Sequence, residues 1–408
     1  MNKKERVRTA INFKNVDKIP TIYRGIKFVS ESLMKYYHFQ DYKDLSKNYK
    51  NLLKKLGADF WASGHNIGLF STFLPSYHRE KPEPLQIEDW SLFYTIGIRS
   101  TPIRINKYDF VYYGYDNKPP LANAQSSNDI EKDFLNSKLD LYDFDLYKNW
   151  INFGMFKDTS ATKDRKGKVE AVDKDNNKLS YENLKKSGEN FICFGSLNQF
   201  FIICCYLRGM EQFLIDLAIN KKLAEYIIKM VGEFVLEFNR RELDAFGDKA
   251  EWYSMWDDIC DQSGLMIPPE LFKKYYYPLY KKLCENVKKH DLIFSWHCCG
   301  NTTQILSYIL DCGVDVYDVV QTSAKNMNLE NIYKICNKKI CLHGVVDVQK
   351  LLVYGKSKNI KEEIKKVINL WGNRGGIILG PSHEIVPGTP IENIIVLYEE
   401  LKKYREDL

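Results

Sequence analysis

A histidine and a cysteine stand two positions apart at the end of a short apolar run. They are His297 and Cys299, in the segment SWHCCG at residues 295–300. Along an extended strand, positions i and i+2 point to the same side, so both side chains can face one point while Cys298 faces the other way. Imidazole nitrogen and thiolate sulfur are preferred ligands of zinc. The pair is therefore a candidate zinc site, although the same residues also suit a buried histidine packed beside two small thiols.

A catalytic zinc keeps three protein ligands and one open position. The candidate third ligand is His383, which follows the last apolar run in the segment GPSH at residues 380–383. The alternative is a histidine that donates a hydrogen bond to a loop carbonyl and only orders that loop.

Acidic and polar residues follow other apolar runs. Asp257 and Asp258 are candidate catalytic acids, as a general base, as a group that orients the substrate or as an extra metal ligand. Alternation lets only one of them face a pocket, and the other would be a helix cap or loop acid. Arg24 can bind an anionic substrate through its fork of donors, or it is a surface arginine. The candidate substrate-binding residues are Tyr23, Arg24, His65, Gln321 and Asp347.

Short apolar runs that alternate with helical patterns must position these residues. The runs cover residues 19–23, 58–61, 191–194, 252–256, 292–296, 314–320, 340–342 and 377–379. Several show little alternation, which is typical of parallel strands buried on both faces. The helical patterns cover residues 210–245 (two helices), 269–290, 302–311, 329–336 and 360–370. The order predicts a (β/α)8 TIM barrel, in which functional groups gather at the carboxyl ends of the strands.

Residues 63–188 interrupt this alternation. Residues 95–99, 102–105 and 110–115 have the pattern of short antiparallel strands, and residues 158–185 are rich in Lys and Asp. We interpret this stretch as a mostly antiparallel insertion that covers the barrel mouth, within a single domain that spans residues 1–408.

The composition excludes several classes of protein. A net charge of +6 from 59 basic and 53 acidic residues is too small an excess to indicate a nucleic-acid-binding surface. No apolar run reaches the ~20 residues that span a bilayer, and the opening MNKKER leads into no apolar signal region. The ten cysteines, two pairs of which are adjacent, predict reduced thiols. We therefore expect a cytoplasmic protein without nucleic-acid or membrane partners.

Several segments, taken in order, resemble uroporphyrinogen decarboxylase-like proteins. The resemblance covers the N-terminal tip and nearly everything after residue 189. The segments are ERVRTAIN (5–12), DKIP (17–20), DD (257–258) with Gln262, Gly264 and IPPEL (267–271), HCCGN (297–301), GVD (313–315) with Gln321, GVVD (344–347), GGIILGPSH (375–383) and TPIEN (389–393).

The resemblance implies a TIM barrel and two possible chemistries. The decarboxylases use no metal and grip their substrate with an N-terminal arginine-rich motif, where this chain has only Arg24. The zinc methyltransferases carry an H-x-C motif, matched by His297 and Cys299, and a distant cysteine. His383 stands in place of that cysteine here, and a histidine also occurs at a similar place in the decarboxylases.

The favoured implication is a Zn²⁺-dependent methyltransferase. It would move a methyl group between a small O-, N- or S-methyl compound and a corrinoid protein or a thiol. The corrinoid (cobalamin) would belong to a separate partner protein, because this sequence has no D-x-H-x-x-G motif. The alternatives are a metal-free decarboxylase or lyase, and a non-catalytic barrel that binds a small molecule.

The insertion leads to a prediction about proteolysis. Limited digestion is expected to cut first within residues 158–185, because so polar a segment buries little surface. Mass spectrometry of the first fragments locates the cut. Recovery of a compact, independently stable fragment of residues 63–188 would instead establish a separate domain.

Overall fold

In a computed structural model, the chain is described over residues 1–42, 45–63, 66–67, 100–105, 110–115, 119–135, 161–163, 169–171, 191, 193–195, 198–248 and 250–406. The candidate residue His65 and the predicted strand at residues 95–99 lie outside these ranges.

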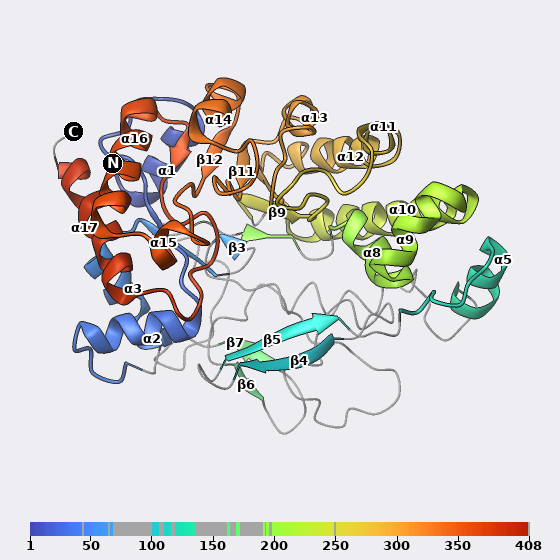
Figure 1. The fold of residues 1–408 in the computed structure, drawn as a ribbon, viewed down its shortest axis with the longest axis horizontal. Helices are drawn as coiled ribbons and strands as arrows, with labels where there is room; N and C mark the ends of the chain where they lie inside the picture. Colours follow the sequence, from blue (N-terminus) through green and yellow to red (C-terminus); the bar gives the residue numbers. More distant parts are fainter. Residues whose placement is uncertain are drawn as a thin grey trace.

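Parallel strands form the centre of the molecule (Figure 1). The strands of the larger sheet are β8 (Cys193–Phe194), β9 (Trp252–Trp256), β10 (Ile293–His297), β11 (Val316–Asp318), β12 (Cys341–His343) and β13 (Ile377–Ile378), which pair in chain order. A second parallel pair joins β1 (Ile22–Tyr23) to β2 (Phe60–Ser63). Parallel bridges from Thr21 to Leu379 and from Gly25 to Ile385 connect β1 with the β13 segment. The predicted parallel α/β architecture is confirmed, whereas closure of the strands into a complete barrel stays a prediction.

Helices follow most of the strands, as the alternation requires. Their bounds are α1 (Lys3–Ile11), α2 (Lys27–Tyr36), α3 (Leu45–Leu56), α5 (Ser127–Asp129), α8 (Phe201–Arg208), α9 (Met210–Ile219), α10 (Lys221–Phe246), α11 (Pro269–Leu271), α12 (Tyr277–Lys288), α13 (Leu306–Cys312), α14 (Leu329–Cys336), α15 (Leu351–Tyr354), α16 (Ser357–Trp371) and α17 (Ile391–Glu406), with π-helical turns at Ile130–Leu135 and Phe272–Tyr276. The predicted break within residues 210–245 falls at Asn220, between α9 and α10. Within the part of the chain that the structure describes, no helix combines the length and apolar character that a membrane-spanning segment needs.

The strands are buried on both faces, which explains why their sequences alternate so little. One face contributes an apolar cluster that also includes Val7 and Ile11 of α1. Its strand members are Ile22, Trp252, Val316, Cys341 and Ile378. The other face packs against the helices through residues such as Tyr23, Tyr253, Tyr317, Leu342 and Ile377. Because side chains from β1, β9, β11, β12 and β13 meet in one cluster, the first face is the concave inner one.

The inner face becomes polar toward the carboxyl ends of the strands. On each strand, the residue two positions after the member of the apolar cluster points to the same face. These residues are Arg24 after β1, Asp318 at the end of β11 and His343 at the end of β12. His297 takes the corresponding place at the end of β10. All four side chains are buried. The fold therefore gathers charged and titratable groups on top of an apolar layer.

Among the described residues, three antiparallel strand pairs accompany the parallel strands. β3 (Asn66–Ile67) pairs with β2, β4 (Ser100–Ile105) with β5 (Phe110–Tyr115), and β6 (Ala161–Lys163) with β7 (Val169–Ala171). The strands predicted at residues 102–105 and 110–115 are confirmed. In Figure 1, β4 and β5 lie on the opposite side of the molecule from α13, α14 and α16. A covering role for this stretch, and its place within a single domain, remain proposals.

The inner apolar layer should contribute directly to stability. Ile378→Ala removes a fully buried side chain and should lower the free energy of unfolding by about 2–5 kcal/mol. The matched control is Ile219→Ala, which truncates a side chain that is 81% exposed and should change stability by at most about 0.5 kcal/mol. Urea titration followed by circular dichroism measures both. Equal losses in the two variants would contradict the layer assignment.

Candidate metal centre

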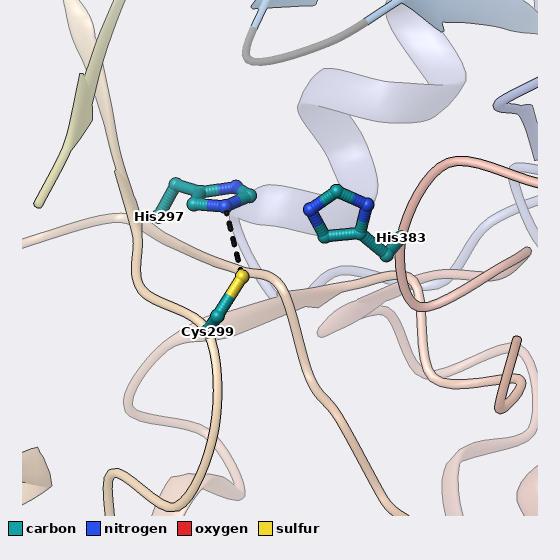
Figure 2. Close-up of side chains that lie close together, drawn as sticks. All are labelled: His297, Cys299 and His383. Atoms are coloured by element: carbon teal, nitrogen blue, oxygen red, sulfur yellow. Dashed lines mark hydrogen bonds between the residues drawn. The ribbon is translucent and has the colours of Figure 1, made fainter. Parts of the chain in front are cut away.

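Three side chains converge at the carboxyl end of the parallel strands (Figure 2). His297 ends β10, Cys299 follows two residues later, and His383 lies in the loop after β13. One ligand atom from each lies within 4.8 Å of the others. His297 Nε2 and Cys299 Sγ are 3.6 Å apart, and the two imidazole rings meet edge to face with their centroids 5.6 Å apart. His297 is fully buried and the other two are half-buried. Within the described residues, this is the group of histidine, cysteine and acidic side chains that could hold a metal ion.

The backbone after β10 turns sharply, and the turn separates the two adjacent cysteines. Cys298 is fully buried and its thiol packs against Cys260. The Cys299 backbone N–H donates to Asp258 Oδ1 at 2.7 Å. Gly300 adopts a φ of +86°, and a Cβ there would lie 2.2 Å from the Asp261 carbonyl oxygen. Only glycine fits this position, so the turn that aims Cys299 at the site is fixed by the sequence.

A buried carboxylate lies beneath the three side chains. Asp318 Oδ2 accepts a hydrogen bond from His297 Nδ1 at 2.7 Å, and Oδ1 accepts one from His343 Nδ1 at 2.7 Å. The Arg24 guanidinium forms an ion pair with the same carboxylate. Burial alone would raise the pKa of Asp318, but Arg24, followed by His343 and His297, holds it well below its usual range. Asp318 is therefore an ionised acceptor that joins three side chains from three strand ends.

Burial favours the neutral form of the His383 and His343 imidazoles. Burial lowers the pKa of His383 to about 3, with His297 and Arg24 acting in the same direction. Burial also lowers the pKa of His343, although the adjacent Asp318 opposes the shift. For the Cys299 thiol, burial and then the Asp258 carboxylate raise the pKa well above its usual value. Neutral imidazole is the form that binds metals, and a bound cation would favour the Cys299 thiolate.

The two candidate catalytic acids point in different directions. Asp257 is fully buried, and its carboxylate accepts hydrogen bonds from three backbone N–H groups at the start of α8 and from the Tyr280 hydroxyl, at 2.8–2.9 Å. Burial raises the pKa of Asp257 to about 6, against the effect of these donors. The donor set ties Asp257 to α8, as in a helix cap. Asp258 instead bonds the Cys299 backbone and thiol, so it is the member of the pair that adjoins the metal site.

The other predicted substrate-binding residues are not gathered in one place. Tyr23 is 1% exposed and faces the helices, where its hydroxyl bonds Ser30 Oγ and its ring packs on Tyr398. Because neighbouring residues of a strand point to opposite faces, the inward position falls to Arg24, which is held by Asp318 and is not exposed as a surface arginine would be.

Of the other two predicted residues, Asp347 lies away from the site and Gln321 lies at it. Asp347 accepts from the backbone N–H groups of Gln349, Lys350 and Leu351 and so caps α15. Gln321 lies at the site: its Oε1 accepts from Gly300 N at 2.8 Å and from Gln262 Nε2 at 2.7 Å. The structure thus brings Gln321, but not Tyr23 or Asp347, to the three converging side chains.

A cleft of about 760 Å³ opens beside His383. Its walls come from the β12–α15 region and from the loop between β13 and α17. The lining residues are Gln321, Val348, Gln349, Val353, Tyr354, His383, Glu384, Val386, Pro387 and Gly388. Its volume suits a small molecule, and it adjoins the site at Gln321 and His383.

Sequence reasoning missed Asp318 and gave His343 no role. A signal for Asp318 was present: it is an acid within the apolar run VDVYDVV at residues 314–320, where a charge must be paired to be buried. Its position two residues after the inward-facing Val316 also places it on the inner face.

The fold and the converging imidazole and thiol groups define a parallel α/β protein with a candidate metal centre at its strand ends. The family model for uroporphyrinogen decarboxylase (URO-D) matches residues 181–404, which is more than half of the chain. The chain belongs to this family, and the resemblance drawn from its motifs is confirmed.

Named relatives include two kinds of enzyme. The chain is 27% identical over 225 residues to the methylcobamide:CoM methyltransferase MtbA of Methanosarcina acetivorans, covering 54% of this chain and 61% of that protein. It is 26% identical over 184 residues to a uroporphyrinogen decarboxylase of Prochlorococcus marinus, covering 45% of this chain and 48% of that protein. The aligned segments therefore span less than two thirds of these relatives. A solved methyltransferase from Methanosarcina mazei shares the fold, with a TM-score of 0.61, 17% identity and 99% of both chains covered.

The two adjacent acids should respond differently to truncation. Asp257→Ala leaves three buried N–H groups at the start of α8 without their acceptor and should cost roughly 3 kcal/mol of stability. Asp258→Ala removes one such bond, to Cys299, and should cost about 1 kcal/mol. Thermal and urea unfolding compare the variants, and a larger loss for Asp258→Ala would refute the assignment of Asp257 to α8.

Proposed function

We propose that this chain is a zinc-dependent methyltransferase. It would transfer a methyl group between a small O-, N- or S-methyl compound and a corrinoid protein or a thiol. The observation that carries the proposal is the convergence of His297, Cys299 and His383 within 4.8 Å. The methylcobamide:CoM methyltransferases among the relatives support the same class of reaction.

The spacing of His297 and Cys299 suits zinc. Zinc binds imidazole nitrogen at about 2.0 Å and thiolate sulfur at about 2.3 Å, so two such ligands of a tetrahedral ion lie about 3.5 Å apart. The separation of His297 Nε2 and Cys299 Sγ is 3.6 Å. The chemistry of the donors fits as well, because imidazole nitrogen and thiolate sulfur are both preferred zinc ligands.

His383 is less prepared than His297 to bind an ion. Its Nδ1 accepts the Glu384 backbone N–H at 2.7 Å, so a metal would have to bind at Nε2, which carries the ring proton in this arrangement. Binding zinc would break that hydrogen bond and move the proton to Nδ1. A bond of this kind contributes about 1 kcal/mol, whereas zinc binding in small zinc peptides reaches about 10–16 kcal/mol. We therefore include His383 as the third and weaker ligand.

Bound at this site, zinc would supply Lewis acidity toward the heteroatom that carries the methyl group, or toward a thiol acceptor. The protein's own groups do the rest. Asp258, next to Cys299, orients the substrate or supplies a proton to the heteroatom as its bond to carbon breaks. The cleft beside Gln321 and His383 admits the small substrate.

The strand ends and residues 63–188 would control how the substrate and a partner protein reach the site. We propose that the parallel strands close into a TIM barrel and that residues 63–188 form an insertion over its mouth. The substrate would enter at the carboxyl ends of the strands, as in other barrels. A corrinoid carried by a separate protein would dock at the same end.

A second function, decarboxylation without a metal, is favoured by one observation. Relatives of the chain include uroporphyrinogen decarboxylases at 25–26% identity. Zinc content and cobalamin-dependent transfer separate the two functions. We expect demethylation of methylated amines, ethers or thioethers only when a corrinoid acceptor is supplied, and release of CO₂ without any metal would favour the decarboxylase instead.

Zinc content provides the most direct test of the metal site. Protein purified without chelator should contain about one zinc per chain. His297→Ala and Cys299→Ala should lose most of it, because each removes one of the two best-placed ligands. Elemental analysis of each variant gives the stoichiometry.

Two further variants act as controls for that test. Cys298→Ala should keep its zinc, because that thiol packs against Cys260. His383→Cys should also keep it, whereas His383→Ala should bind zinc more weakly. A wild-type protein that contains no transition metal after zinc supplementation rules the metal site out.

A further inference from the structure

We propose that Asp318 is a positioning residue that fixes His297 in the one tautomer able to bind an ion beside Cys299. The inference concerns a residue outside the three converging side chains, and it rests on the proposed function only where zinc affinity is the readout.

The chemistry of the Asp318 carboxylate determines where the His297 ring carries its proton. An ionised carboxylate can only accept hydrogen bonds, so the 2.7 Å contact from His297 Nδ1 to Asp318 Oδ2 places the ring proton on Nδ1. In the neutral ring, which is the form that binds a metal, Nε2 of His297 then holds the lone pair. That same Nε2 lies 3.6 Å from Cys299 Sγ (Figure 2), so the lone pair belongs to the nitrogen that faces the thiol.

The other two partners hold the carboxylate in its orientation. His343 Nδ1 donates to Oδ1 at 2.7 Å, and Arg24 forms an ion pair with the same oxygen and lies 3.4 Å from Oδ2 through its second terminal nitrogen. Rotating the carboxylate to free His297 would disrupt these contacts as well. All four side chains are at most 3% exposed, so water cannot replace the lost bonds at low cost.

The backbone donor at His383 gives a contrast within the same site. There an N–H group donates to Nδ1 and favours the opposite tautomer, with the proton on Nε2. The two histidines therefore face the candidate ion in different states. His297 is preorganised by Asp318, and a hydrogen-bonded carboxylate behind a ligand imidazole commonly raises metal affinity about 10–100-fold.

The test is Asp318→Asn, which keeps the side-chain volume but offers one acceptor oxygen in place of two. It can accept from His297 or from His343, but not from both. In metal-free protein with ¹⁵N-labelled histidine, we expect the wild type to show the Nδ1–H tautomer at His297, assigned by comparison with His297→Ala. In Asp318→Asn we expect a mixture of tautomers at His297 or at His343.

Zinc affinity, measured by competition with a chromophoric chelator, should fall about 10–100-fold in Asp318→Asn. The matched control is Asp216→Asn, which breaks another buried arginine–aspartate pair, Arg208–Asp216, on α8 and α9. It removes a buried charge of the same kind and should leave both the His297 tautomer and the zinc affinity unchanged.

A stability effect can be separated from positioning. Asp318→Asn leaves Arg24 buried beside a neutral side chain, so the double variant Arg24→Gln/Asp318→Asn, which removes both charges, is the second measurement if the single variant fails to fold. Unchanged tautomer and unchanged zinc affinity in a folded variant overturn the inference. A changed tautomer in a protein whose wild type binds no zinc supports positioning by Asp318 and rejects the proposed metal site.

Discussion

The buried carboxylate of Asp318 is the interaction on which the upper half of the inner face depends. Asp318 ends β11, and it accepts from side chains at the ends of β10 and β12 and from Arg24 after β1. The ends of four strands are therefore joined through one carboxylate. An unpaired carboxylate at this depth would be strongly unfavourable, and the Arg24 charge compensates for its lost hydration. The geometry of His297, and through it that of the candidate metal centre, follows from this charge pair.

Much of the fold could be predicted from the sequence because the strands are short apolar runs between helical patterns. All eight runs contain a parallel strand, and the break near Asn220 divides a long helical pattern as expected. Helix α8 was missed for a physical reason. Its sequence FIICCYLR is apolar on almost every side and buried throughout most of its length, so it lacks the polar face that reveals an amphipathic helix.

The candidate site was only partly predictable. The two-residue spacing of His297 and Cys299 predicted that the two side chains lie together, but β10 ends at His297 and the turn at Gly300 directs Cys299 to the site. The different roles of Asp257 and Asp258 depend on which of them contacts the start of α8. Asp347 was predicted to bind substrate because it follows a strand, but it caps α15 instead. These are contacts between segments distant in the chain or hidden in local turns, and spacing alone carries no information about them.

Val7 and Ile11 of helix α1 pack in the inner apolar layer, at the end of the strands opposite the polar groups. That end of the interior is therefore plugged by the protein's own first helix. Among the described residues, the cleft beside Gln321 and His383 lies at the other, carboxyl end of the strands. Two reactants that meet at this site would therefore approach from the same end, so a small one would have to lie in the cleft before a bulky partner covers it.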